Sequence, residues 1–397
     1  MHPVELAKGI YWVGAVDWDL RTFHGEALST HRGSTYNSYL IIDERPTLID
    51  GVWGPFTDVL LRNVAEIIDP ANLQVVVANH VEPDHSSALP AVLARCPGAE
   101  VVCSARAKDA LLKHYYGDWN FRVVKTGDAV SIGQRTLSFI EAPMLHWPDS
   151  MFTYLVEDQI LMPNDAFGQH IATSHRFDDQ VDLDEVMVEA QKYYANILLP
   201  FSGLVARKLS EVQKMNLPIR MIAPSHGIIW RKDIGRILDA YTKWSTPGGE
   251  TGCVIAYDTM WGSTHLMAEE IAQGMLDAGI PVKILRTSTT DTNDVIAEMA
   301  KYKGLVVGSP TVNRMTLPDV AKFMHETVSL RPAGKIGAAF GSFGWSGEAA
   351  TELTEQLKSV GTKIAAEPLK LKWVPSPDEI AACRAFGRTV AEAILQG

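Results

Sequence analysis

The segment from His80 to His85, with the sequence H-V-E-P-D-H, carries the densest group of potentially reactive side chains. It follows the apolar run of residues 73–78, so we expect it to form the loop that leaves a buried strand. A loop can turn two imidazoles and two carboxylates toward one small volume, as a binuclear metal centre requires. The simpler alternative is a solvated, charged loop that happens to contain two histidines.

Three further candidate ligands also follow apolar, strand-like runs. His146, Asp165 and His226 each come just after such a run. Strand ends that point toward one edge of a fold bring their ligands together, so these segments predict a single site. The remaining histidines are expected to be ordinary core or surface residues, and these include His24, His31, His114, His170 and His175.

The combined set of candidate ligands contains four imidazoles and three carboxylates. Such an oxygen-rich set suits two iron ions, with Asp165 able to bridge them, whereas zinc would be served by more nitrogen. The predicted metal ligands are His80, Glu82, Asp84, His85, His146, Asp165 and His226.

A second motif lies in the other half of the chain, where T-M-W-G-S-T (residues 259–264) leads from a strand-like run into a helical pattern. A phosphate there would receive backbone N–H groups and hydroxyl donors, although the loop contains no Lys or Arg. The alternative is an ordinary turn whose Ser and Thr cap the helix. The loops at residues 309–313 and 341–347 suit close approach to a flat ring, and no G-x-G-x-x-G follows the first strand. A mononucleotide therefore fits better than a dinucleotide.

These motifs fall in two halves separated by a Pro- and Gly-rich stretch, residues 243–252. Ten of the twelve histidines precede this stretch, so we place the domain boundary there, with domains 1–248 and 249–397. In the second domain five strand-like runs alternate with five helical patterns, which predicts a doubly wound parallel α/β sheet. The first begins with short strand-like runs and then mixes strands with helices, which predicts two β-rich sheets with helices outside them.

Length, charge and cysteine content narrow the class of protein further. The 397 residues allow two or three domains, and the net charge of −11 argues against a nucleic-acid partner. The four cysteines form no C-x-x-C pair and are expected to be reduced thiols. With no basic leader and no apolar run near the roughly 20 residues of a membrane span, we expect a cytoplasmic protein.

The spacing of the candidate ligands resembles that of the metallo-β-lactamase superfamily, whose hydrolytic zinc members carry histidine where this chain has Glu82. The H-x-E-x-D-H segment, with LHWPDSM (residues 145–151) and NDAFGQH (164–170), resembles the flavodiiron protein family, or A-type flavoproteins, which includes rubredoxin:oxygen oxidoreductases. YDTMWGST (257–264) and GSFGWSGE (341–348) closely resemble the flavodoxin domain of that family. The resemblance spans nearly the whole chain and implies a metallo-β-lactamase-like αβ/βα sandwich followed by a flavodoxin-like domain.

The resemblance also implies how the ligands divide. One iron would be held by His80, Glu82 and His146, and a second by Asp84, His85 and His226, with Asp165 bridging. His85 is the least dependable ligand in the family, so the residues expected to take part in catalysis are the other six. Phe23, His24, Trp147 and Tyr194 are candidates for lining the substrate pocket.

FMN is the cofactor implied for the second domain. Its phosphate would lie on residues 259–264 and its isoalloxazine ring between the two later loops. The implied contacts are Thr259, Met260, Trp261, Gly262, Ser263, Thr264, Pro310, Thr311, Asn313, Ser342, Phe343, Gly344, Trp345, Ser346 and Gly347.

The activity implied by the family is reduction of O2 to water, of NO to N2O, or both. The residues do not distinguish O2 from NO, since both are small, neutral and bind ferrous iron. With no C-x-x-C motif in the chain, electrons are expected from an external donor, a rubredoxin-like protein or a deazaflavin. The family also implies a head-to-tail homodimer. The alternatives are a zinc hydrolase with a regulatory flavodoxin domain, which Glu82 argues against, and a non-catalytic flavin electron carrier or redox sensor.

Overall fold

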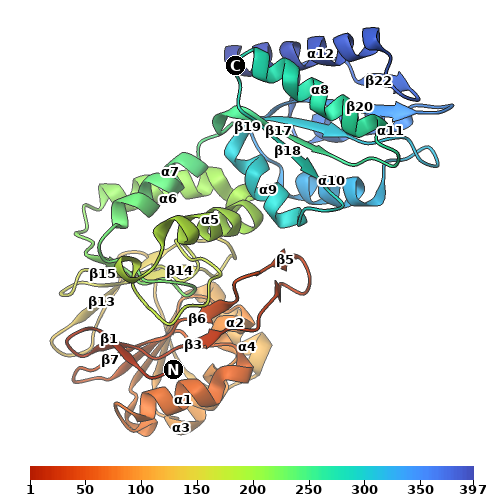
Figure 1. The fold of residues 1–397 in the computed structure, drawn as a ribbon. Helices are drawn as coiled ribbons and strands as arrows, with labels where there is room; N and C mark the ends of the chain where they lie inside the picture. Colours follow the sequence, from red (N-terminus) through yellow and green to blue (C-terminus); the bar gives the residue numbers. More distant parts are fainter. The chain divides into compact units, whose positions relative to one another are not determined.

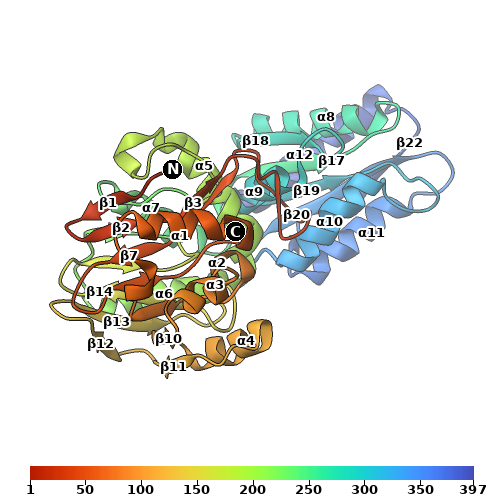
Figure 2. The same cartoon turned by 90° about the horizontal axis from the view of Figure 1, so that it is seen from below.

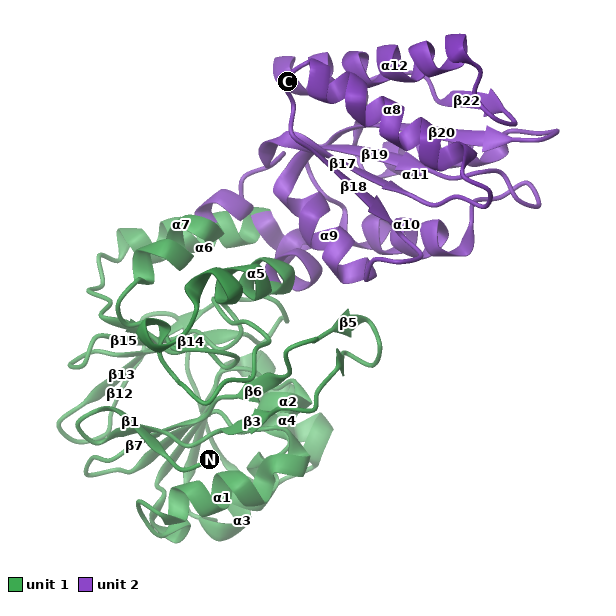
Figure 3. Cartoon of the chain, viewed as in Figure 1, with its two compact units in different colours: residues 1–193, 203–241 green, residues 194–202, 242–397 purple.

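The computed structural model describes residues 1–397 and divides into two compact units, which Figure 3 colours separately. Unit 1 contains residues 1–193 and 203–241, and unit 2 contains residues 194–202 and 242–397. The predicted fold class, a mixed α/β part followed by a parallel α/β part, is confirmed. The segment 194–202 joins unit 2 through contacts such as the 2.8 Å hydrogen bond from Asn293 Nδ2 to Asn196 Oδ1.

Two sheets form the framework of unit 1. The first has seven strands in the order β1-β2-β7-β8-β9-β10-β11, and the second has five in the order β12-β13-β14-β15-β16. The first sheet contains β1 (Val4–Ala7), β2 (Ile10–Trp12), β7 (Tyr39–Ile41), β8 (Thr47–Ile49), β9 (Val75–Ala78), β10 (Glu100–Cys103) and β11 (Asn120–Val123). The second contains β12 (Ala129–Ser131), β13 (Thr136–Glu141), β14 (Met151–Leu155), β15 (Ile160–Met162) and β16 (Met221–Ile222). Two small antiparallel sheets of two strands each pair β3 (Ala15–Asp17) with β6 (Ser34–Tyr36) and β4 (Thr22–Phe23) with β5 (Leu28–Ser29).

Helices cover the outer faces of these sheets, as Figures 1 and 2 show. Strand β9 illustrates the layering, because Val76 packs into the core with the helices while Val75 and Val77 pack between the sheets. Successive strand residues face opposite sides, so a strand buried on both faces is apolar throughout. The result is the predicted αβ/βα sandwich. Its helices are α1 (Thr57–Ala65), α2 (Pro83–Ser86), α3 (Leu89–Arg95), α4 (Ala105–Tyr115), α5 (Leu183–Tyr193), α6 (Ser202–Lys214) and α7 (Ile234–Trp244).

Unit 2 contains one parallel sheet in the order β18-β17-β19-β20-β21, with β22 also pairing with β20. This is the flavodoxin-like order, and it confirms the predicted doubly wound sheet. Cys253, Ile255 and Tyr257 of β17 pack on one face, whereas Val254 and Ala256 pack on the other. The strands are β17 (Glu250–Tyr257), β18 (Val282–Arg286), β19 (Tyr302–Gly308), β20 (Ile336–Phe343), β21 (Lys363–Ile364) and β22 (Leu369–Lys372).

Five helices cover the two faces of this sheet. They are α8 (Ser263–Asp277), α9 (Thr292–Lys301), α10 (Pro318–Leu330), α11 (Glu348–Ser359) and α12 (Pro377–Gln396). Residues of α8 and α12 pack on one face, and residues of α9, α10 and α11 pack on the other. None of the chain's helices, including the 20-residue α12, combines the length and apolar character that a bilayer crossing requires.

Lys335 is a buried cation just before β20, with only 3% of its surface exposed. Its Nζ donates hydrogen bonds to the carbonyl oxygens of Gly248 (3.0 Å), Ala300 (3.2 Å) and Tyr302. Burial lowers the pKa of Lys335 to about 7, because the charged form loses its hydration.

This burial makes the stability of the fold pH-dependent. In the unfolded chain the pKa of a lysine is about 10.4, so between the two values the folded state binds fewer protons and stability rises with pH. We predict that the free energy of unfolding of the wild type, measured relative to that of Lys335→Met, rises by about 2 kcal/mol from pH 7.5 to pH 9. Guanidinium unfolding of both proteins at several pH values measures this difference, and a pH-independent difference would contradict the burial cost.

Candidate metal and flavin sites

The candidate metal ligands all lie beyond the ends of strands in unit 1. His80 and Glu82 follow β9, while His146, Asp165 and His226 follow β13, β15 and β16. The expectation that residues 80–85 form a loop throughout is wrong. Pro83 begins the one-turn helix α2, since its fixed φ and missing N–H suit a first helical position. Asp84 and His85 therefore project from a helical turn.

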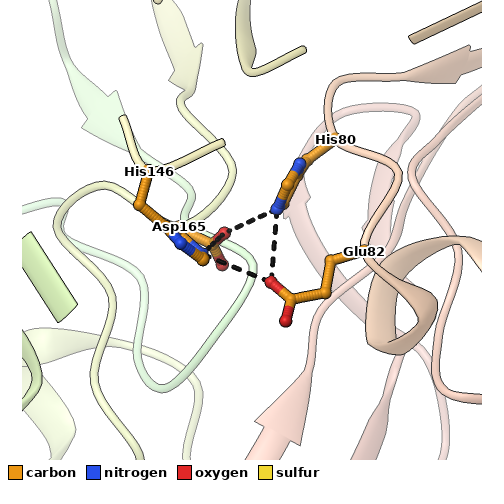
Figure 4. Close-up of side chains that lie close together, drawn as sticks. All are labelled: His80, Glu82, His146 and Asp165. Carbon is orange, nitrogen blue, oxygen red and sulfur yellow. Dashed lines mark hydrogen bonds and ion pairs between the residues drawn. The ribbon is translucent and has the colours of Figure 1, made fainter. Parts of the chain in front are cut away.

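Four of these side chains form a first group, shown in Figure 4, in which their polar ends are turned toward one another. Glu82 Oε2 lies 3.3 Å from Nε2 of His80 and 3.3 Å from Nε2 of His146. Asp165 Oδ2 lies 3.6 Å and 3.3 Å from the same two nitrogens. One donor atom from each of the four lies within 4.8 Å of the others, which is close enough to surround one ion.

The remaining three candidates form a second group. Asp84 Oδ2 lies 3.2 Å from Nε2 of His85 and 3.1 Å from Nε2 of His226. The other oxygen of Asp165, Oδ1, lies 3.0 Å and 3.5 Å from the same nitrogens. Asp165 thus directs one carboxylate oxygen toward each group, which is the arrangement of a bridging ligand.

Several buried atoms of the candidate ligands, most of them in the second group, lack hydrogen-bond partners. Both carboxylate oxygens of Asp84, Oδ2 of Asp165 and both ring nitrogens of His85 are buried without a hydrogen bond. Buried charges without partners are costly, and a metal ion supplies the missing interaction. The mixture of imidazole and carboxylate donors in each group fits iron. The residues therefore fit a pair of metal ions.

Electrostatics keep the shared carboxylate ionised. Burial alone would raise the pKa of Asp165, but the adjacent imidazoles of His85 and His146 outweigh this effect and hold the pKa well below its usual range. A carboxylate that stays charged in a buried site is ready to bind cations.

Hydrogen bonds to neighbouring residues fix the rings of some ligand histidines but not of others. His80 Nδ1 donates to Asp149 Oδ2 at 2.8 Å, and His226 Nδ1 donates to the carbonyl oxygen of Thr35 at 2.6 Å. Such outer contacts fix the tautomer and direction of a ligating imidazole. His85 has no such partner on its Nδ1. His85 therefore lacks the kind of outer contact that holds the rings of His80 and His226.

The loops that carry ligands are tied together by Asp50, which the sequence analysis did not select. Its carboxylate accepts hydrogen bonds from the backbone and side chain of Asn79 at 2.7 and 3.0 Å and from Asn164 Nδ2 at 3.1 Å. Asn79 precedes His80, and Asn164 Oδ1 accepts from the backbone N–H of Asp165 at 2.9 Å. One buried carboxylate thereby links two ligand loops.

Three of the predicted pocket residues contact the metal groups. The ring centroid of Phe23 lies 5.8 Å from that of His226, and the centroid of Trp147 lies 5.2 Å from that of His80. His24 Nε2 lies 2.9 Å from Glu82 Oε1, the oxygen that does not face the first group. Of the two interpretations given to His24, an ordinary histidine or a pocket residue, this contact favours the second.

The tyrosine beside the metal groups is Tyr193, whereas the sequence analysis named Tyr194. Tyr193, the last residue of α5, has its ring 6.2 Å from that of His226 and 5.1 Å from that of His170. Tyr194 instead donates to Ser202 Oγ at 3.0 Å and packs against Trp244. His170 is buried beside His226, yet its Nδ1 pairs with Ser34 Oγ at 2.8 Å and it belongs to neither metal group.

The three predicted flavin loops lie at the carboxyl ends of the unit 2 strands. Residues 259–262 connect β17 to α8, residues 309–313 follow β19, and residues 344–347 lead from β20 into α11. The loops are joined, since Thr264 Oγ1 lies 2.9 Å from Ser342 Oγ and Thr311 donates its N–H to Ser342 at 3.0 Å.

Two observations show that these loops fit FMN. Gly262 has φ +92°, and a Cβ added there would meet no atom within 4 Å, so the loop leaves open space at the N-terminus of α8. The first N–H groups of a helix have no intrahelical partner and suit a phosphate. Trp261 and Trp345 are 90% and 82% exposed, which leaves aromatic surface for a flat ring. By contrast, Thr264 is fully buried and its hydroxyl already pairs with Ser342.

Comparison with known proteins agrees with the two-domain architecture. Residues 35–227 match the family model described as ODP family beta lactamase, and residues 255–387 match the flavodoxin model. Over 395 residues the chain is 53% identical to the nitric oxide reductase of Moorella thermoacetica, covering 99% of both chains. It is 44% identical over 392 residues to the anaerobic nitric oxide reductase flavorubredoxin of Aeromonas salmonicida, covering 98% of this chain and 75% of that protein.

Two solved structures share the fold over the full length. Rubredoxin oxygen:oxidoreductase from Desulfovibrio gigas has a TM-score of 0.96 at 36% identity and covers 100% of this chain and 99% of its own. The flavodiiron protein from Giardia intestinalis has a TM-score of 0.95 at 34% identity, with 100% and 97% covered. The chain belongs to the flavodiiron protein family. The sequence-based resemblance to this family is thus confirmed.

The two donor groups of this flavodiiron protein lead to a test of the bridge. We predict that Asp165→Ala, which removes the carboxylate facing both groups, reduces bound iron from two ions per chain to well below one. His175→Ala, which removes an exposed histidine outside both groups, serves as the control and should leave the iron content unchanged. Metal analysis of both purified proteins measures this, and equal metal loss would contradict the assignment.

Proposed function

We propose that this flavodiiron oxidoreductase reduces O2 to water, NO to N2O, or both, at two iron ions, with electrons relayed through FMN. The observation that carries the proposal is Asp165, whose two oxygens face two separate donor groups in a chain that also contains a flavodoxin-type unit. The names of the relatives support it, since one is a nitric oxide reductase and another a rubredoxin oxygen:oxidoreductase.

The proposed ligand roles follow the two groups. His80, Glu82 and His146 would hold one iron, Asp84, His85 and His226 the other, and Asp165 both. Asp149 and the Thr35 carbonyl would keep two of the imidazoles aimed at the ions. Phe23 and Trp147 would exclude water from the reacting side, because each packs against a ligand ring.

His24 is placed to hold a proton beside the centre. Its Nε2 lies 2.9 Å from Glu82 Oε1, and its side chain is 29% exposed, so the imidazole contacts both a ligand carboxylate and solvent. Reduction of O2 or NO consumes protons, and a histidine in this position can pass them inward.

Two cofactors complete the proposal, namely FMN and a pair of non-haem iron ions. When bound, reduced FMN and two ferrous ions together hold the four electrons that O2 needs to become water. Residues 259–264 would hold the phosphate, and residues 310–313 and 342–347 would contact the ring. Because these residues belong to unit 2 and the metal ligands belong to unit 1, we propose that electron entry and substrate reduction occur in different domains, with the bounds 1–248 and 249–397.

The proposal also includes an electron donor, an oligomeric state and a cellular location. We propose a rubredoxin-like external electron donor, which the name of the Desulfovibrio gigas relative supports. From the resemblance to the family we propose a head-to-tail homodimer. The four cysteines are all buried and unpaired, which supports a reducing, cytoplasmic location.

A single substitution tests the relay. Ser263 is the first residue of α8, so Ser263→Glu places a carboxylate where the FMN phosphate is expected and should empty the flavin site by charge repulsion. We predict loss of FMN, retention of two irons, and a fall of at least 100-fold in steady-state O2 or NO consumption with a rubredoxin donor. A chemically pre-reduced sample still holds two electrons in its iron ions, so it should convert two NO to one N2O in a single turnover, whereas O2 would need two further electrons to reach water.

Thr389→Glu is the matched control, because it introduces the same charge on the exposed face of α12. It should keep both FMN and activity. A Ser263→Glu protein that lacks FMN, retains iron and turns over at the wild-type rate would overturn the relay. Absence of any single turnover by the iron-loaded, pre-reduced protein would favour a non-catalytic electron carrier.

A further inference from the structure

An ion pair lies directly beside the predicted phosphate loop of unit 2. Asp258 follows β17 and is only 4% exposed, and Arg286 is the last residue of β18. The two strands pair in parallel with Tyr257 opposite Arg286, which brings the arginine to the start of the loop. Arg286 Nε donates to Asp258 Oδ1 at 2.8 Å. The loop itself contains no Lys or Arg, and the sheet register supplies a cation from outside it.

The pair also holds the loop backbone. Asp258 Oδ1 accepts further hydrogen bonds from the N–H of Thr259 at 2.8 Å and from Ser288 Oγ at 3.1 Å. Arg286 Nη2 donates to the carbonyl oxygen of Thr259 at 3.3 Å. Thr259 Oγ1 in turn accepts from the N–H of Gly262 at 3.0 Å, which closes the loop. Both backbone groups of Thr259 are therefore fixed by the ion pair.

The charge balance of this arrangement matters for a phosphate ligand. A carboxylate next to a phosphate site repels the dianion, and removal of one partner from a buried pair leaves the other charge uncompensated. Arg286 neutralises Asp258 while its guanidinium remains partly exposed, with 43% of the side chain accessible. The loop can then receive a dianion despite the acidic residue that precedes it.

We infer that Asp258 and Arg286 form a charge-balanced brace that positions the phosphate loop and makes it selective for a phosphorylated flavin over an unphosphorylated one. Both are positioning residues, since they act through Thr259. The inference rests on the proposed binding of FMN at residues 259–264.

The test compares the affinities of the apoproteins for FMN and for riboflavin, measured by flavin fluorescence quenching. Arg286→Gln should raise the Kd for FMN more than fivefold, because Asp258 is left uncompensated, and should change the Kd for neutral riboflavin less than twofold. Adding Asp258→Asn to Arg286→Gln should return the FMN Kd to within fivefold of wild type, since the repelling charge is gone. Arg286→Lys should also stay within fivefold, because it keeps the positive charge.

Arg384→Gln serves as the control variant. It breaks another arginine–carboxylate pair of unit 2, Arg384 with Glu270 on α8, and should leave both affinities unchanged. The brace is overturned if Arg286→Gln stays within fivefold for FMN, weakens FMN and riboflavin equally, or is not rescued by Asp258→Asn. If Arg286→Gln does not fold, an FMN Kd raised more than fivefold by Arg286→Lys overturns it instead. Results that contradict this role of Asp258 and Arg286 leave the proposed function intact. FMN binding that survives Ser263→Glu would instead contradict the phosphate site itself.

Discussion

The constraint on which unit 1 depends is the concentration of buried ionisable groups around Asp165. Seven imidazole and carboxylate side chains share one interior volume, and several of their polar atoms have no hydrogen-bond partner. Without cations this arrangement would be strongly destabilising, since each uncompensated buried charge carries a desolvation cost. Two metal ions would compensate these charges. Because one oxygen of Asp165 faces each group, the two ions would share this carboxylate.

The rest of unit 1 serves to hold this volume in place. The αβ/βα sandwich brings the ends of four strands from two sheets to the same region, so ligands separated by up to 146 residues meet. Asp50 links the loops before His80 and Asp165, and Asp149 orients the His80 ring. Unit 2 solves a different problem, the binding of a charged mononucleotide, with backbone groups at a helix N-terminus and an ion pair beside them. Each unit has its own core, which is consistent with separate tasks of electron entry and substrate reduction.

Much of this was predictable because it depends on local pattern. The alternation of β17 between two cores and the H-x-E-x-D-H segment after an apolar strand can both be read from neighbouring residues. The contributions of Asp50 and Asp149 could not, because a carboxylate shows its role only when folding brings a distant histidine or asparagine to it. Asp149 had one local sign, its position three residues after His146 in the same motif.

Two expectations from the sequence differ from the structure, and each difference has a physical cause. Tyr193 contacts the site and Tyr194 contacts Trp244, because consecutive helical residues point in directions about 100° apart. Pro83 begins a helical turn that carries Asp84 and His85. The many polar residues of this segment instead suggested a loop. The attachment of residues 194–202 to unit 2 depends on tertiary contacts alone, such as those of Asn196 and Asn293.

The central claim is that Asp165 bridges two iron ions. Low-temperature Mössbauer spectroscopy of the oxidised protein, loaded with iron-57 and with its iron content determined, tests it most directly. The account predicts two high-spin ferric ions per chain whose spins couple antiferromagnetically to a diamagnetic ground state. A single iron per chain, or two ions with the magnetic spectra of isolated ferric sites, would contradict it.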